Sequence, residues 1–182
     1  MSTKLKYKND ASMMDASIKL LKEVDIQKAL SKNDLNEFYK IAIEFIELGT
    51  IYCPDNIGDA TQMLFNFGID IFDYIDYIPP YCFFYTSLEY IEIPKHIKHI
   101  DEDAFSYCDI TKITIPSNVE TVGSFAFHDC DDLKLIKFEK GVKKIGDFAF
   151  NGTGGTIVIP ESTNTSLHVF GGCTAKILRE ND

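Results

Sequence analysis

Residues 91–94, Ile-Glu-Ile-Pro, return as residues 113–116, Ile-Thr-Ile-Pro, so that position 91 maps to position 113 with an offset of 22. The same offset carries residues 104–108, Ala-Phe-Ser-Tyr-Cys, onto residues 126–130, Ala-Phe-His-Asp-Cys. A repeat of fixed period between about 20 and 50 residues is the sequence signature of a protein built from stacked coils. The stretch from 91 to 132 therefore predicts a solenoid.

Further copies flank this stretch on both sides. Ile69–Ile71 begins a copy 22 positions before Ile91, and Ile136–Phe138 begins one 23 positions after Ile113. Ile157–Pro160 begins another copy, whose middle is rich in Ser, Thr and Asn and which recovers the pattern only at its end, near Cys173. The sequence thus predicts a solenoid of about five short β coils over residues 69–182.

Each copy opens with alternating apolar residues, the pattern of a short strand that buries one face. Ile113 and Ile115 are expected to point into the core, and Thr114 between them to point out. The phenylalanines at 83, 105, 127 and 150 are expected to stack from coil to coil. The outward strand positions should form one continuous face, which we predict to be the partner-binding face: Tyr90, Glu92, Lys112, Thr114, Leu135, Lys137, Thr156 and Val158.

Residues 1–68 have a different character. The first ten residues are polar and are expected to form a loose arm. From residue 12 the apolar spacing is helical, most clearly where Leu35, Phe38, Ala42 and Phe45 form one stripe before Gly49. We predict an α+β protein in which these helices either cap the exposed apolar end of the first coil or form a small independent interaction module.

The repeat unit resembles the BspA-type leucine-rich repeats, whose pattern looks like L-x-x-I-x-I-P-x-x-V-x-x-I-G-x-x-A-F-x-x-C. The resemblance covers residues 69–182 and departs from the pattern at Phe72 and Glu139 for proline, Asp101 for glycine and Thr153 for cysteine. Such repeats are similar to protein-recognition scaffolds of bacterial and protist cell-surface proteins and also occur in phage-encoded proteins. A fold of this kind does not fix a function.

The composition excludes several classes of partner. The chain has 182 residues, a net charge of −10 and a pI near 4.8. This acidity disfavours binding to nucleic acid and to anionic membranes. It favours a protein partner, which could be a basic protein. Neither a signal peptide nor an apolar run of the ~18 residues that span a membrane is evident, so a cytoplasmic location is expected, in the producing or a host cell. The five cysteines are then expected to be reduced, with Cys108 and Cys130 buried. The oligomeric state stays open.

The motifs that could carry chemistry are better interpreted as structural elements. His96 and His99 lie among lysines without acidic or thiol partners at ligand spacing, and Cys130 beside His128 repeats the slot of Cys108, unlike a nucleophile. Glycine-rich residues 152–155 lack the Lys-Ser/Thr of a phosphate loop. We therefore expect no catalytic residue, metal or cofactor. The acidic clusters look like solvated turns or a second candidate edge for a basic partner: Asp101, Glu102, Asp103, Asp131 and Asp132.

Three functions are weighed on these grounds. The leading prediction is a non-enzymatic protein–protein interaction module that uses the repeat sheet. The alternative is a phage-encoded inhibitor of a host nuclease or defence complex that uses its acidic surface. The third is an enzyme with a site at the junction of cap and solenoid, where Tyr7, Tyr52 and Cys53 are candidates by location alone.

Overall fold

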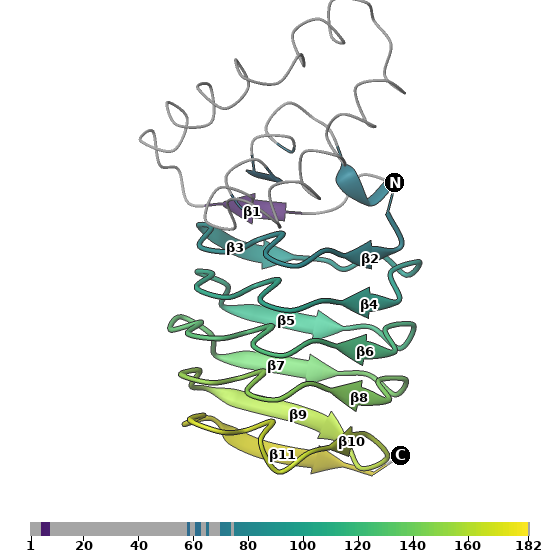
Figure 1. Cartoon of the computed structure of the whole chain (residues 1–182), viewed down its shortest axis with the longest axis vertical. Coiled ribbons are helices and arrows are strands. Elements are labelled where there is room, and N and C mark those ends of the chain that lie inside the picture. The colour runs from purple at the N-terminus through teal and green to yellow at the C-terminus, as the bar shows by residue number, and fades with distance from the viewer. Residues whose placement is uncertain are drawn as a thin grey trace, which may run out of the picture.

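Short strands recur at the repeat period and alternate between two sheets. The structure is a computed structural model, and it describes residues 5–7, 58, 61, 62, 65, 70–73 and 75–181. Neighbouring strands in each sheet come from successive copies of the repeat, so both sheets run the length of the solenoid (Figure 1). Because a single coil cannot bury its own apolar residues, stacking on neighbouring coils supplies the core.

Sheet A holds the longer strands and sheet B the shorter ones. The repeat strands of sheet A are β3 (Leu88–Ile91), β5 (Lys112–Ile115), β7 (Leu135–Phe138), β9 (Thr156–Pro160) and β11 (Lys176–Glu180). Those of sheet B are β2 (Tyr77–Ile78), β4 (His99–Ile100), β6 (Thr121–Val122), β8 (Lys144–Ile145) and β10 (Asn164–Thr165). All neighbouring repeat strands are parallel, and the predicted solenoid of about five coils is confirmed.

The third side of each coil is a turn segment that leads from sheet B to the next strand of sheet A. We call the stack of these segments the turn face; its segments are residues 79–86, 101–108, 123–130, 146–153 and 166–173. The N–H of Phe83 donates to the carbonyl of Ala104 at 2.8 Å, and the N–H of Phe105 donates to that of Ala126 at 2.9 Å. The turn face is therefore a third backbone ladder, in which each segment donates to the next.

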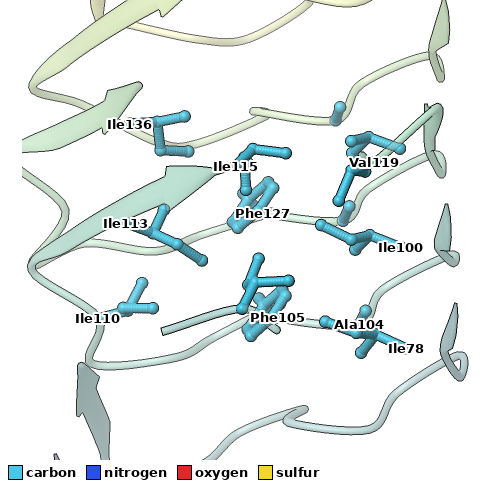
Figure 2. Packing of buried hydrophobic residues seen from close by; sticks show 14 of the residues in the cluster. Ile78, Ile100, Ala104, Phe105, Ile110, Ile113, Ile115, Val119, Phe127 and Ile136 are labelled. Carbon is cyan, nitrogen blue, oxygen red and sulfur yellow. The ribbon is translucent and has the colours of Figure 1, made fainter. Parts of the chain in front are cut away.

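A column of phenylalanine rings runs through the core. The centroids of Phe83, Phe105, Phe127 and Phe150 are successively 5.0, 5.2 and 6.0 Å apart, and adjacent ring planes differ by 6, 2 and 10°. All four rings are buried, and Figure 2 shows two of them among apolar side chains that include Ile100 of sheet B. The predicted stacking is confirmed, and each ring buries a large apolar surface on both neighbours.

The first coil differs from the prediction at its sheet A side. Ile69–Ile71 was expected to begin a strand, but Ile71–Asp73 is a 3-10 helix, η2. The place beside β3 is taken by β1 (Leu5–Tyr7), which pairs with it antiparallel. The expectation of a loose arm is therefore wrong for residues 5–7. An added strand satisfies the N–H and C=O groups that an edge strand leaves unpaired, which explains its position.

Four described residues of the predicted cap contact the first coil or are buried beside it. Gly58, Thr61, Gln62 and Phe65 each have helical backbone; the first three are buried and Phe65 is half-buried. Phe65 stacks on Phe83 at a centroid distance of 6.3 Å, which extends the phenylalanine column by one ring. The other predicted cap positions lie outside the described residues, so the complete helical cap stays a prediction. In the described part, no helix has the length and apolarity needed to cross a lipid bilayer.

The last coil carries a charged residue at a core position. Arg179 of β11 is in register with Ile159 of β9, which is buried. Its guanidinium donates to the carbonyl of Thr163 at 3.2 Å and to the hydroxyl of Thr165 at 2.7 Å. Arg179 is itself exposed, and a charged side chain on an edge strand discourages pairing with another edge.

Candidate functional site

The outer face of sheet A holds most of the predicted partner-binding residues at the surface. The sheet register aligns Tyr90, Lys112, Leu135, Thr156 and Lys176 in one row across the strands. Tyr90 is 42% exposed, both lysines are exposed, and the side chains between them are half-buried. This row joins an aromatic, an aliphatic and cationic groups, a mixture that suits contact with another protein.

The second row of this face contains one error of prediction. Thr114, Lys137, Val158 and Leu178 are in register across the strands. Val158 was expected to be exposed, yet it is only 6% exposed. It lies between Lys137 and Leu178, and the Lys137 ammonium reaches over β9 to the Glu180 carboxylate at 3.2 Å. Long side chains from both neighbouring strands thus cover this small residue, as amphipathic lysine stems commonly do.

The acidic positions do not form a single edge. Asp101, Glu102 and Asp103 follow β4 at the sheet B end of a turn segment, whereas Asp131 and Asp132 lie beyond the end of the next segment, near sheet A. The latter two and Glu102 are exposed, and the remaining two are half-buried. Burial raises the pKa of the Asp101 and Asp103 carboxyls above their ordinary value, because desolvation disfavours the charged form.

An aromatic surface on the turn face was missed by sequence reasoning. Tyr85 is 69% exposed and Tyr107 is 40% exposed, with ring centroids 6.1 Å apart. The series continues through His128, whose ring lies 5.1 Å from that of Tyr107, to Phe125 and Phe148. Tyr85 and Tyr107 are 22 positions apart and Phe125 and Phe148 are 23 apart, so each pair repeats at the coil offset, but neither position is aromatic in every coil. The available signal was the high aromatic content of the turn segments.

Several of these side chains stand on left-handed backbone. Tyr85 and Tyr107, each two residues after a phenylalanine of the column, have φ of 55 and 58°. The equivalent positions in later coils hold Asp129, Gly152 and Gly172, all with positive φ. The backbone conformation is therefore a property of the repeat, which the inter-coil hydrogen bonds fix. Tyrosine is an unusual residue there, because its Cβ crowds the neighbouring carbonyl.

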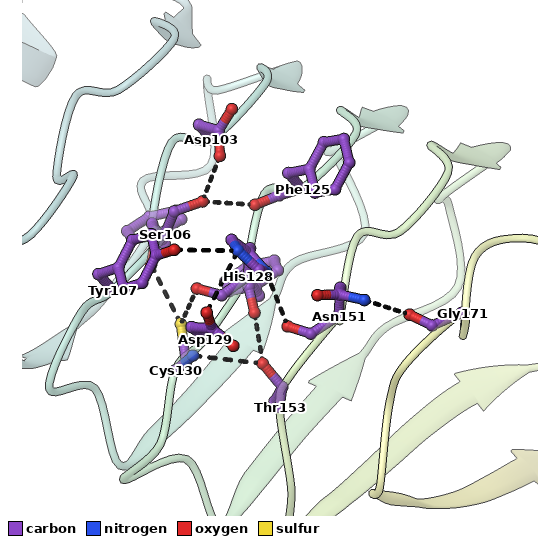
Figure 3. A network of polar contacts seen from close by, with 12 residues as sticks. Asp103, Ser106, Tyr107, Phe125, His128, Asp129, Cys130, Asn151, Thr153 and Gly171 are labelled. Atoms are coloured by element: carbon purple, nitrogen blue, oxygen red, sulfur yellow. Dashed lines mark hydrogen bonds and ion pairs between the residues drawn. The ribbon is translucent and has the colours of Figure 1, made fainter.

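A polar network connects Tyr107 through His128 to the backbone of the next coil (Figure 3). The Tyr107 hydroxyl lies 3.2 Å from Nε2 of His128, and the same nitrogen lies 3.2 Å from the Asp129 carboxylate. Nδ1 of His128 lies 3.1 Å from the carbonyl of Asn151 in the next coil. On the other side, the Ser106 hydroxyl contacts Asp103 at 2.6 Å. The network orients Tyr107 and Asp129 without supplying a nucleophile.

The cysteines form a structural ladder with threonines. One hydroxyl or thiol per coil occupies the position three residues after the column phenylalanine: Thr86, Cys108, Cys130, Thr153 and Cys173. The Cys108 thiol donates to the carbonyl of Phe83 at 2.7 Å, and that of Cys130 donates to Phe105 at 3.1 Å. Burial raises the pKa of Cys108 to about 12, which keeps the thiol neutral and unreactive. The predicted burial of Cys108 and Cys130 is confirmed, and the four described cysteines are free.

His96 and His99 each lie within hydrogen-bonding distance of a protein oxygen. His96 Nε2 lies 2.6 Å from the carbonyl of Phe72, and His99 Nδ1 lies 2.8 Å from the hydroxyl of Thr121. Within the described residues, no group of three or more His, Cys, Asp and Glu side chains is placed to hold a metal ion. Of the junction candidates, Tyr52 and Cys53 lie outside the described residues, and for Tyr7 only the backbone is described.

Comparison with known proteins agrees with this architecture. A family model described as the BspA type Leucine rich repeat region matches residues 64–176 in six copies. No curated protein matches the chain. The crystal structure of the pneumococcal vaccine antigen PcpA shares the fold with a TM-score of 0.54 and 23% identity, over 58% of this chain and 28% of the antigen.

A leucine-rich repeat protein from Bacteroides capillosus gives a TM-score of 0.41 and 28% identity, over 46% of this chain and 64% of that one. The chain therefore spans less than two thirds of either structure. The likeness to PcpA establishes the solenoid and carries no information on the partner.

Proposed function

Because the chain belongs to the BspA-type leucine-rich repeat family, we propose that it is a non-enzymatic, cytoplasmic protein-recognition module that binds a protein partner through the outer face of sheet A. The observation that carries the proposal is the aligned row from Tyr90 to Lys176, which presents aromatic, aliphatic and cationic groups side by side on five parallel strands. A rigid scaffold of this kind limits the entropy lost on association.

The proposed contact area centres on Tyr90 and Lys137. Tyrosine supplies a large contact surface with few rotatable bonds, and residues of this type are enriched among the energetically dominant positions of interfaces. Lys137 stands in the second row, where its ion pair with Glu180 holds the ammonium over β9. A partner would therefore meet an exposed ring on β3 and, farther along the same face, a cation oriented over β9. Val158 is covered and is withdrawn from the proposed contact set.

The test is affinity capture with the full chain, followed by mass spectrometry. The double variant Tyr90→Ala/Lys137→Glu is expected to lose the partner captured by the wild type, with an unchanged melting temperature. Lys98→Ala is the matched control, because Lys98 is an exposed lysine outside sheet A. Capture that survives the double variant contradicts this choice of face.

The nuclease-inhibitor alternative has weaker support from the geometry. A DNA-like inhibitor needs carboxylates in a continuous array, and the two acidic clusters lie at opposite ends of their turn segments. If neutralising Asp131 and Asp132 abolished capture while the sheet A double variant did not, the acidic alternative would replace the present proposal. An enzymatic role at the junction of cap and solenoid would require turnover that depends on Tyr52 or Cys53.

A further inference from the structure

We propose that the turn face is a second recognition surface, which binds an extended arginine-rich segment of a protein partner. In this arrangement guanidinium groups stack on Tyr85 and Tyr107 and pair with the carboxylates of Asp103 and Asp129. The surface lies on a different side of the coil from the outer face of sheet A, and the proposal stands whether or not that face binds a partner.

The first argument is that the backbone at these positions does not need tyrosine. Both occupy a left-handed backbone position that later coils fill with Gly152 and Gly172. Glycine adopts such a conformation without a steric cost, whereas tyrosine does not. Both rings are nevertheless held at the surface, Tyr85 with more than half of its area in contact with solvent. Tyr107 packs edge-on against Phe84, with centroids 5.5 Å apart, but a partly exposed tyrosine on left-handed backbone in two successive coils is still a reason to look for a function.

The second argument is the charge of the turn face. Its five segments contain no lysine or arginine, and their acidic residues are Asp101, Glu102, Asp103, Asp129 and Asp147. Among the described residues, the only ion pair of these carboxylates is that of Asp129 with His128, at 3.2 Å. The carboxylates thus lack lysine or arginine partners within this part of the chain. A cationic segment would find uncompensated negative charge beside exposed rings, which is electrostatic complementarity of the kind that steers association.

The third argument is geometric. The Tyr85 and Tyr107 centroids are 6.1 Å apart, close to the roughly 6.6–6.8 Å that separates alternate residues of an extended chain. A segment with arginine at every second position, running along the solenoid axis, can therefore place successive guanidinium groups on successive rings. Arginine suits this arrangement better than lysine, because its planar group both stacks on aromatic rings and binds carboxylates with two hydrogen bonds.

The polar network prepares the site for such a ligand. Asp129 and the Tyr107 hydroxyl share Nε2 of His128, and Asp103 is held by the hydroxyl of Ser106. The carboxylates and the ring are therefore oriented before a partner arrives. Nucleic acid does not fit, because its phosphates would meet like charge. A neutral oligosaccharide could use the rings but has no need of the carboxylates, and this difference can be measured.

The experiment measures the binding of a fluorescent peptide of alternating arginine and serine to the full-length chain by anisotropy. The variant Tyr85→Gly/Tyr107→Gly is expected to bind about tenfold more weakly, since two exposed cation–π contacts are lost. Its melting temperature should not fall, because glycine suits both backbone positions. Asp103→Asn/Asp129→Asn should bind more weakly and with a smaller dependence on salt. Tyr90→Ala removes an exposed tyrosine from sheet A and should leave binding unchanged.

A second variant keeps the test decisive if the glycine substitutions disturb the fold. Tyr85→Leu/Tyr107→Leu retains a bulky apolar side chain on the same backbone but removes the aromatic face, and it should also bind weakly. Retention of wild-type affinity by either tyrosine double variant overturns the proposal. So does equal binding of a matched glutamate–serine peptide, or binding that neutral oligosaccharides compete and that Asp103→Asn/Asp129→Asn leaves intact. Capture through sheet A is measured separately, so the two proposals can fail independently.

Discussion

Replacing Phe127 by alanine tests whether the phenylalanine column is the energetic centre of the solenoid. The ring is fully buried, with Phe105 stacked at 5.2 Å on one side and Phe150 at 6.0 Å on the other. Truncation of a buried phenylalanine costs about 3–5 kcal/mol, and stacked pairs add about 0.5–1.5 kcal/mol beyond their buried area. Because Phe127 loses a partner in both directions, we expect a cost in the upper half of that range, about 4 kcal/mol or more.

That cost is a large part of the roughly 5–15 kcal/mol that stabilises a typical domain. For a chain of this size each kcal/mol lowers the melting temperature by about 2–4 °C, so Phe127→Ala should melt roughly 8–16 °C below the wild type. Urea unfolding followed by circular dichroism gives the free energy of unfolding, and differential scanning fluorimetry gives the melting temperature.

Two matched variants decide the interpretation. Phe170 ends the column and is half-buried, and among the described residues it stacks on Phe150 alone, at 5.8 Å, so Phe170→Ala should cost about half as much. Lys98→Ala removes an exposed side chain and should stay within about 0.5 kcal/mol of the wild type. Equal melting temperatures for Phe127→Ala and Lys98→Ala would refute the reasoning, since a core column cannot be removed at no cost.

Three further outcomes are expected. Gly141→Ala should lower the free energy of unfolding by more than about 1 kcal/mol, because Gly141 has φ of 149° and an added Cβ would overlap the carbonyl oxygen of Ser117. Under native conditions a thiol reagent should label half-buried Cys173 well before buried Cys108, as peptide mass mapping would reveal. Burial raises the pKa of Asp103, so its folded carboxyl holds a proton more tightly than the unfolded one, and stability is lost as the pH rises through the folded pKa. Asp103→Asn abolishes that loss, so its unfolding free energy relative to the wild type should increase as the pH rises above the ordinary Asp pKa of about 4.

Each of these outcomes has its own control. Gly154→Ala should be nearly neutral, because its Cβ would approach only the Thr174 hydroxyl, at 3.6 Å. Cys130 occupies the same buried slot as Cys108 and should be equally protected; rapid labelling of both would mean that the coils open in the native state. An Asp103→Asn variant whose stability tracks the wild type at every pH would show that this carboxyl is solvated.

The parts of the fold that recur at the repeat offset could be predicted from sequence. Phe105 and Phe127 are 22 positions apart and occupy equivalent positions of the repeat, where each packs on the other. The period alone therefore predicts the phenylalanine column. The strand of sheet A beside β3 could not be predicted in this way. That strand is β1, which lies more than 80 residues upstream of β3 in sequence. It pairs with β3 antiparallel, with Lys6 in register with Tyr90. Such a contact depends on tertiary proximity and leaves no periodic signal.

The surface was harder to predict than the core because its positions vary. Tyr85 and Tyr107 share one slot at the repeat offset, but Asp129 and Gly152 follow at that slot, so the aromatic signal stops after two coils. Val158 was misplaced for a related reason. Its outward direction follows from the strand pattern, but its burial depends on the Lys137–Glu180 ion pair that crosses β9. Alternation gives the side of a strand on which a residue lies, and only neighbouring strands determine what covers it.

The turn face has a polarity that makes the two ends of the solenoid unlike. Each segment donates N–H groups toward the C-terminal coil and accepts through carbonyls that face the N-terminal coil. A second molecule could continue this ladder only by placing its N-terminal end on the C-terminal end of the first. Two C-terminal ends in contact would oppose donor to donor. Repeated head-to-tail contact generates open filaments. In this protein β1 occupies the edge of sheet A at the N-terminal end, and Gly58 packs against the carbonyl of Phe84. These contacts occupy acceptor positions of the first coil, so we expect the N-terminal end to resist head-to-tail stacking of another copy.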